Sequence, residues 1–168
     1  MKNRDVEVII LKRIQEKNSK FAIYPASDFK FDRKLKLPRV VSQTLNNSIM
    51  HHLSKEIELD DNYIGYEEIS NHKHIIQLTF VLDKDTSYND VEEIRLMLKH
   101  KAGNRYYFVL NGVNLIIQKV GDIKDISEHT EATYLERYCI EIEVSSVERY
   151  IEKIEKIKKV DFKVGGNK

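Results

Sequence analysis

The chain begins with a segment whose apolar residues recur at helical spacing. Between residues 4 and 18 one face is apolar and the opposite face is charged. This pattern is typical of an amphipathic helix that packs on a core. A short extended piece over 21–24 follows, and Pro25 ends it. The residues of the apolar face are Val6, Ile9, Ile10 and Ile14.

Several later segments have the composition or alternation of strands. Residues 39–49 alternate after Pro38, with polar residues on both faces, which predicts a strand that is only partly buried. Residues 74–82 are rich in β-branched and aromatic side chains, and 113–120 are similar. Between the first two strands, Asp60-Asp61-Asn62 is a turn signal.

Residues 133–144 predict a long strand whose second half alternates cleanly. Such alternation is typical of a sheet with one core face and one face that meets water or a partner. Tyr138, Ile140, Ile142 and Val144 are expected to face inward, and Cys139, Glu141, Glu143 and Ser145 outward.

A second helix is predicted over residues 87–101. Ser87 and Asn89 are candidate N-caps, acidic residues occupy the first turn, and Gly103 suits the end. Residues 105–111 have two interpretations. Asn111-Gly112 between apolar runs is a hairpin signal, whereas a short helix ending at Gly112 fits equally well.

The C-terminal segment has helical spacing. Residues 145–148 match a capping box, and isoleucines recur every three residues from Ile151 to Ile157. Glu152 and Lys156 are at the spacing of a helical ion pair. Propensity alone therefore predicts a helix over about 146–160.

These elements predict an α+β domain, with helices packed on one face of a mainly antiparallel sheet. We expect one domain over 1–168 with a core over about 5–162 and a flexible tail over 163–168. Residues 26–37 are polar but carry alternating Phe29, Phe31, Leu35 and Leu37, which predicts an exposed loop or arm whose aromatic side chains need a partner.

Composition narrows the function classes. The 168 residues include 28 basic and 27 acidic ones, and the net charge of +1 disfavours a general nucleic-acid or membrane-surface binder. Cys139 is the single cysteine, so no internal disulfide forms. The first apolar run, residues 8–11, is too short for a signal peptide or a membrane span, which predicts a chain made in the cytosol.

The residues that bear reactive groups form no catalytic pattern. His72 and His74 share a face if they lie on a strand, but the spacing indicates no third metal ligand. His51 and His52 would point to opposite faces. The glycines are isolated, so there is no phosphate-binding loop. We therefore predict no enzyme activity, with no catalytic, cofactor-binding or metal-binding residue and no cofactor.

The order and spacing of seven segments over residues 5–162 are similar to those of the neck or tail terminator family of tailed phages. The stretch 121–157 is the most similar. The family often has aromatic residues after the Leu-Pro, where this chain has Arg39 and Val40. The segments are Leu37-Pro38-Arg39-Val40-Val41, Ile75 to Phe80, Asp90 to Leu98, Leu110 to Val113, Val120 to Ser127, Tyr134 to Ile142 and Ile151 to Ile157.

The resemblance implies a flat α+β subunit that assembles into a ring, usually six-fold, on top of the tail tube. Such a ring ends tube growth and docks the head. The implied partners are further copies of the chain, tail tube protein and a head-completion or neck protein. DNA would pass through the ring without sequence-specific binding, and no membrane is involved. The implied location is the virion neck, after assembly in the host cytoplasm.

The resemblance also favours a short helix before Gly112, which we adopt, and an extended final segment, which leaves 146–160 open between helix and strand. Rings need one patch that meets a different patch on the next copy. From exposure we predict subunit or partner contacts in the loop, on the outward strand face and near the end. They are Phe29, Phe31, Arg33, Lys36, Glu141, Glu143, Glu152, Lys153 and Lys156.

Three other functions stay open. The chain could be another neck component, such as a head-completion or stopper protein. It could be a small metal-dependent enzyme or regulator that uses His72, His74 and acidic residues. It could bind single-stranded nucleic acid by stacking bases on Tyr106, Tyr107 and Phe108, although the near-zero net charge disfavours this.

Overall fold

A computed structural model describes residues 2–26, 35–60, 62–129 and 134–156. It confirms the mixed α+β class, with three helices and a six-stranded, mostly antiparallel sheet in the described residues. The helices are α1 (Asn3–Lys17), α2 (Tyr88–Lys99) and α3 (Lys101–Leu110). The strands are β1 (Ala22–Pro25), β2 (Arg39–Glu58), β3 (Tyr63–Val81), β4 (Leu115–Val120), β5 (Lys124–Asp125), β6 (Glu128–His129), β7 (Tyr134–Leu135) and β8 (Arg137–Glu155).

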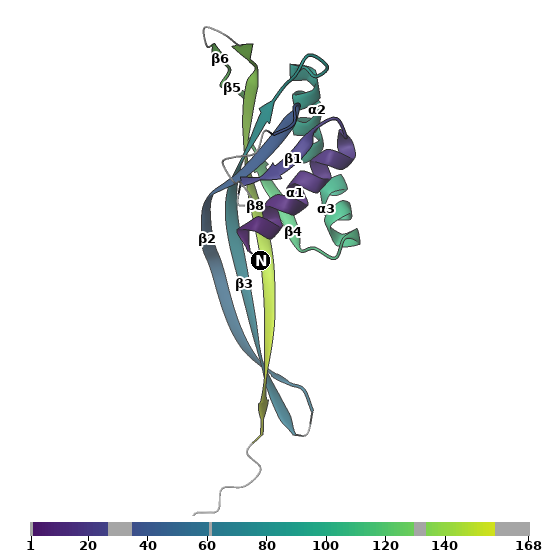
Figure 1. The fold of residues 1–168 in the computed structure, drawn as a ribbon. Helices are drawn as coiled ribbons and strands as arrows, with labels where there is room; N and C mark the ends of the chain where they lie inside the picture. The colour runs from purple at the N-terminus through teal and green to yellow at the C-terminus, as the bar shows by residue number, and fades with distance from the viewer. Residues whose placement is uncertain (1, 27–34, 61, 130–133, 157–168) are drawn as a thin grey trace, which may run out of the picture.

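The large sheet has the strand order β1-β2-β3-β8-β4, with β5 also paired to β8. Only β1 and β2 run parallel. The three helices lie on one side of the sheet, as predicted (Figure 1). β6 and β7 form a separate two-stranded ribbon at one end.

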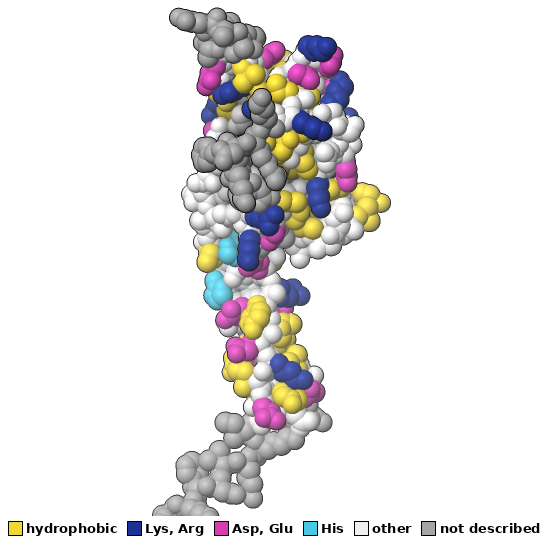
Figure 2. Space-filling view, in the orientation of Figure 1, with side chains coloured by type: hydrophobic (Ala, Val, Ile, Leu, Met, Phe, Trp, Pro, Cys, Tyr) yellow, Lys and Arg dark blue, Asp and Glu magenta, His cyan; other side chains and the backbone are white. Residues whose placement is uncertain are grey.

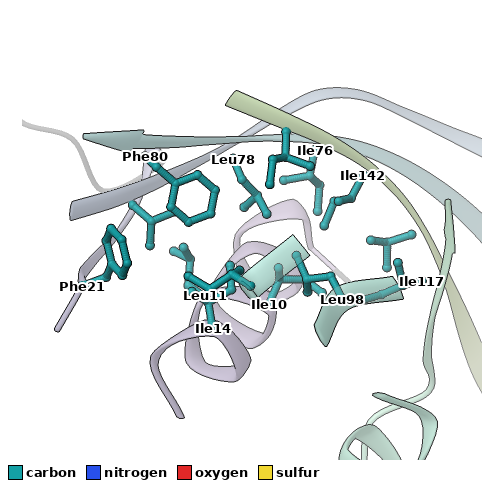
Figure 3. Packing of buried hydrophobic residues seen from close by; sticks show 14 of the residues in the cluster. Ile10, Leu11, Ile14, Phe21, Ile76, Leu78, Phe80, Leu98, Ile117 and Ile142 are labelled. Carbon is teal, nitrogen blue, oxygen red and sulfur yellow. The ribbon is translucent and has the colours of Figure 1, made fainter. Parts of the chain in front are cut away.

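The core lies between the helices and the middle of the sheet (Figure 3). Phe21 contacts Phe80 edge to face, with ring centroids 5.6 Å apart. Alternation on β8 buries Ile140, Ile142 and Val144, as predicted, because these residues share the helix side of the strand. The helices contribute Val6, Ile10, Leu11, Ile14, Val91, Ile94, Leu98 and Phe108.

The helical interpretation of the segment before Gly112 is confirmed. The predicted helix 87–101 ends at Lys99, and α3 begins two residues later. The buried Asn104 explains the break, because its amide nitrogen donates to the carbonyl oxygens of Met97 and Leu98 and so caps α2. Gly112 has a φ of +66°, a conformation that glycine adopts without strain.

The predicted bounds of three strands were wrong, because β2, β3 and β8 all extend beyond the expected residues. Residues 146–155, which the sequence left open between helix and strand, form a strand. β2 continues past residue 49 to Glu58, β3 starts at Tyr63 rather than near 74, and β8 runs on to Glu155. Residues 146–155 of β8 pair in unbroken register with β3. The ladder satisfies their backbone groups, so strand pairing overrides helix propensity and the capping-box pattern.

The three long strands extend well beyond the helices as a narrow projection (Figure 1). We call this projection the stalk, and it comprises residues 49–58 of β2, 63–72 of β3 and 146–155 of β8. Extension of β8 as a strand builds the third strand of the stalk. Asp60 and Tyr63 exchange backbone hydrogen bonds at its tip, and Asp61 of the predicted turn lies outside the described residues.

Candidate assembly surfaces

The predicted contact residues do not form one patch. Phe29, Phe31 and Arg33 lie outside the described residues. Lys36 is exposed, and its backbone nitrogen donates to the hydroxyl of Tyr24 at 3.3 Å. The other predicted residues lie on β8 and just after it.

Glu141 and Glu143 lie on the side of β8 that faces away from the helices, as predicted, and each is paired with a lysine. Lys124 Nζ is 2.9 Å from Glu141, and Lys73 Nζ is 2.7 Å from Glu143. The hydrogen bond from Lys73 lowers the pKa of Glu143. This strip is therefore charge-neutralised within one copy, which makes it a weaker contact candidate than exposure alone suggests.

Glu152 and Lys153 point to opposite faces of the stalk, because the segment is a strand and not a helix. Lys153 Nζ lies 3.7 Å from the centre of the Tyr63 ring. Lys156 follows the strand and pairs with Glu58 at 3.3 Å. Glu152 is exposed and has no ion pair among the described residues.

One face of the stalk continues the helix side of the sheet, and we call it the acidic face. Cross-strand partners and alternate residues share a face, and His74, which contacts Asn3 of α1, fixes which face this is. Within the three strands this face carries five exposed glutamates and no lysine or arginine. The glutamates are Glu56, Glu58, Glu68, Glu148 and Glu152.

The acidic face is also apolar to an unusual degree. Ile49 is 64% exposed and Tyr150 is 61% exposed, and Tyr66 and Ile154 lie nearby in the register. Figure 2 shows hydrophobic side chains among the charged ones along the whole stalk. Tyr66 lies between Tyr150 and Ile154 in the β3–β8 register, and exposed apolar side chains that gather on one surface are typical of an interaction site.

The opposite face of the stalk is mixed in charge. Arg149 pairs with Glu67 at 3.0 Å, and Lys55 and Lys153 also lie on this face. Leu53 and Ile151 are about half exposed here. The two faces therefore differ chiefly in charge, because the opposite face carries three basic and two acidic side chains whereas the acidic face carries acidic ones alone.

A second apolar surface lies where α3 meets the edge strand β4, and we call it the α3–β4 edge. Tyr106, Val109 and Leu110 point away from the core, each about two-thirds exposed. Shallow hollows of about 360 and 310 Å³ lie between α3 and β4, both lined by Arg105 and Ile116, and Val109 lines the second. Tyr107 packs against the core and Phe108 is buried, so only Tyr106 of the predicted stacking trio is available.

The α3–β4 edge is strictly basic. Residues 99–120 contain no aspartate or glutamate. Lys101 and Arg105 make no ion pair within the described part of the chain. The surface is thus apolar in the middle and positively charged beside it. The four basic residues of this stretch are Lys99, Lys101, Arg105 and Lys119.

His72 and His74 do share a face of β3, with ring centroids 6.3 Å apart. His74 is buried, and Asn3 Oδ1 lies 3.2 Å from Nδ1 while Ser146 Oγ lies 2.9 Å from Nε2. Because the amide oxygen can only accept, Nδ1 carries the proton and Nε2 accepts from the serine hydroxyl. Both ring nitrogens are engaged, which leaves His74 no lone pair for a metal. No cluster of three potential metal ligands occurs among the described residues.

Cys139 lies on the side of β8 away from the helices, as predicted, but it is not exposed there. Its side chain is buried, between Thr79 of β3 and Lys124 of β5 in the sheet. Burial raises the pKa of the thiol. A raised pKa disfavours the thiolate that a nucleophilic cysteine needs.

The acidic face and the α3–β4 edge are the surfaces that the sequence prediction missed. The acidic face depends on strand pairing, which a single sequence does not reveal. One feature of the sequence could have indicated the α3–β4 edge. The 22 residues from 99 to 120 include no acidic side chain.

Comparison with known proteins gives one family match, over residues 36–167, to the model described as phage neck terminator protein. This stretch includes both surfaces and every strand of the large sheet except β1. No curated protein matches the chain. No helix among the described residues is long and apolar enough to cross a membrane.

Proposed function

Since the chain belongs to the phage neck terminator protein family, we propose that it assembles into a ring at the tail–head interface. Six copies are the expected number. The ring ends growth of the tail tube below and docks the head above. Its partners are tail tube protein and a head-completion or neck protein, and DNA passes through without sequence-specific binding.

The exposed apolar strip of the stalk is the observation that best supports this proposal. Three strands project beyond the helices with large apolar side chains on both faces. In an isolated copy these side chains face water, at a cost of about 25 cal/mol per Å² of apolar surface. Neighbouring proteins in an assembly would remove this surface from water.

The family is structural, which implies a non-enzymatic role. The chemistry of the described residues is compatible with such a role. The single thiol is buried with a raised pKa, and the buried histidine has both nitrogens engaged. Neither group is presented to a substrate.

The proposal is tested by phage that lack this chain, with the chain supplied from a plasmid as the control. We expect filled heads without tails, together with tails whose tubes vary in length. The plasmid copy should restore joined particles with tails of uniform length. Uniform tails with leaking heads would instead indicate a head-completion or stopper protein, and would contradict the terminator role.

A further inference from the structure

The acidic face and the α3–β4 edge are complementary to each other. The acidic face carries five exposed glutamates around apolar side chains, of which Glu58 pairs with Lys156 and Glu148 lies near His72 in the same copy. The α3–β4 edge carries lysine and arginine beside Tyr106, Val109 and Leu110. We propose that the acidic face of one copy docks on the α3–β4 edge of the next copy around the ring. This inference rests on the proposed ring and names its contact surface.

The charges support a second copy as the occupant. Glu56, Glu68 and Glu152 have no ion pair among the described residues, so their charges are available to a partner. Lys101 and Arg105 of the α3–β4 edge likewise have no ion pair among the described residues. Each surface therefore carries the opposite excess of charge, and complementary potentials select and orient partners.

The apolar side chains supply the centre of such a contact. Tyr150 and Ile49 project from the acidic face, and Tyr106 and Leu110 project from the edge. The hollows beside α3 can accept side chains of this size. Their walls include Val109, Val113 and Ile116. An apolar centre with a charged rim is the usual anatomy of a specific protein interface.

The topology permits this contact to repeat. The stalk adjoins the α3–β4 edge only at its root, where Ser146 of β8 pairs with Leu115 of β4. Glu68 and Glu152 lie farther along the stalk, so each copy can present one surface to each neighbour. A contact between two different patches is heterologous, and a heterologous contact closes into a ring when its rotation permits. Two copies that bury the same patch would instead stop at a dimer.

The test is a charge swap. One variant combines Lys101→Glu with Arg105→Glu, a second combines Glu68→Lys with Glu152→Lys, and a third carries all four substitutions in one chain. The control combines Lys12→Glu on α1 with Lys84→Glu after β3, two exposed lysines that belong to neither surface. It changes the net charge as much as the first variant. Circular dichroism verifies that every variant is folded.

Ring formation is followed by mass photometry over a concentration series. The first two variants should each need roughly ten-fold or more higher concentration for half assembly, because like charges meet across the contact. The four-fold variant should recover most of this loss, and the control should assemble like the wild type. Rings that are unchanged in the first variant, or no recovery in the four-fold variant, would overturn the inference.

Binding to the ends of tail tubes is measured in parallel by co-sedimentation, so that the two proposals can fail separately. Tube-end binding without any self-association of the wild-type chain would overturn the inference and leave the neck role standing. Normal rings with lost tube binding in the Lys101→Glu, Arg105→Glu variant would assign the edge to tail tube protein. Self-association that follows the charge swap, without tube binding, would support the contact and contradict the terminator role.

Discussion

The carboxylate of Glu7 on α1 holds Thr44 of β2 by two hydrogen bonds. Its Oε1 accepts from both the backbone nitrogen and the side-chain hydroxyl of Thr44, each at 2.7 Å. Glu7 is only 3% exposed. Thr44 immediately precedes an irregularity in the β2–β3 register, just before β2 enters the stalk. This pair therefore ties the first helix to the root of the projection.

Glu7→Ala should lower the free energy of unfolding by about 2 kcal/mol, because hydrogen bonds to a charged group contribute roughly 1.5–3 kcal/mol. Urea unfolding followed by circular dichroism measures the change. The control is Glu93→Ala on α2, since Glu93 is exposed and its loss should have little effect. Equal stability of the two variants would contradict a supporting role for the Glu7–Thr44 pair.

Stability should fall below neutral pH in part because of His74. Burial, then the neighbouring His72, lowers the pKa of His74 in the folded chain from the ordinary value of 6.5. As the pH falls through about 6.5, the unfolded chain binds a proton that the folded chain does not. The free energy of unfolding therefore decreases with falling pH, until the pH reaches the lower pKa of the folded state.

Unfolding titrations at pH 7.5 and 5.5 measure this contribution. His74→Asn should show a smaller difference between the two pH values than the wild type. His51→Asn, at an exposed position of the stalk, should keep the wild-type difference. An unchanged pH dependence in His74→Asn would place the responsible groups elsewhere.

Replacement of isoleucine by alanine should lower the free energy of unfolding far more in the core than in the stalk. Ile76 is fully buried, and its replacement by alanine should cost about 2–5 kcal/mol of unfolding free energy. Ile151 in the stalk is 47% exposed, and the same replacement should change the stability of an isolated copy by only about 0.5 kcal/mol. Similar losses at both positions would mean that Ile151 is already covered in the isolated chain.

Asn104→Leu should destabilise the chain although it adds apolar volume. The amide nitrogen of Asn104 donates to Met97 and Leu98, and its oxygen accepts from Arg13 Nε at 3.3 Å. The carbonyl oxygen of Met97 also accepts from the backbone nitrogen of His100, but the substitution removes the buried side-chain donor to Leu98, at about 1–3 kcal/mol. Thermal unfolding should show a lower midpoint than that of Asn111→Leu, whose side chain lies exposed at the end of α3. A raised midpoint would contradict the capping role.

The elements that were correctly predicted are those whose local pattern and burial agree. The first helix has an apolar stripe that meets the core, and 138–144 alternate because one face is covered by helices. The stalk could not be predicted in this way. Its strands are exposed on both faces, so their sequences do not show the alternation of apolar and polar residues that a half-buried strand has. The isoleucines of β8 even have helical spacing. Their conformation is set by backbone pairing with β3, which is distant in sequence.

The predicted contact residues show the same division. Glu141 and Glu143 were correctly predicted to lie away from the helices. Their lysine partners could not be predicted, because these lysines lie on other strands of the sheet. Glu152 was chosen from its expected exposure in a segment left open between helix and strand, and it is exposed because it lies on one face of the stalk. Which surface a charged residue joins depends on strand register, and single-sequence patterns do not encode register between segments that are distant in sequence.

The central claim, that this chain caps tail tubes as a ring, is tested most directly by the mass and shape of what it forms. Purified protein is examined by mass photometry and negative-stain microscopy, alone and after mixing with tail tubes. We expect closed rings of about six copies, free or bound to tube ends. A chain that stays a monomer at every concentration and leaves tube ends bare would contradict it.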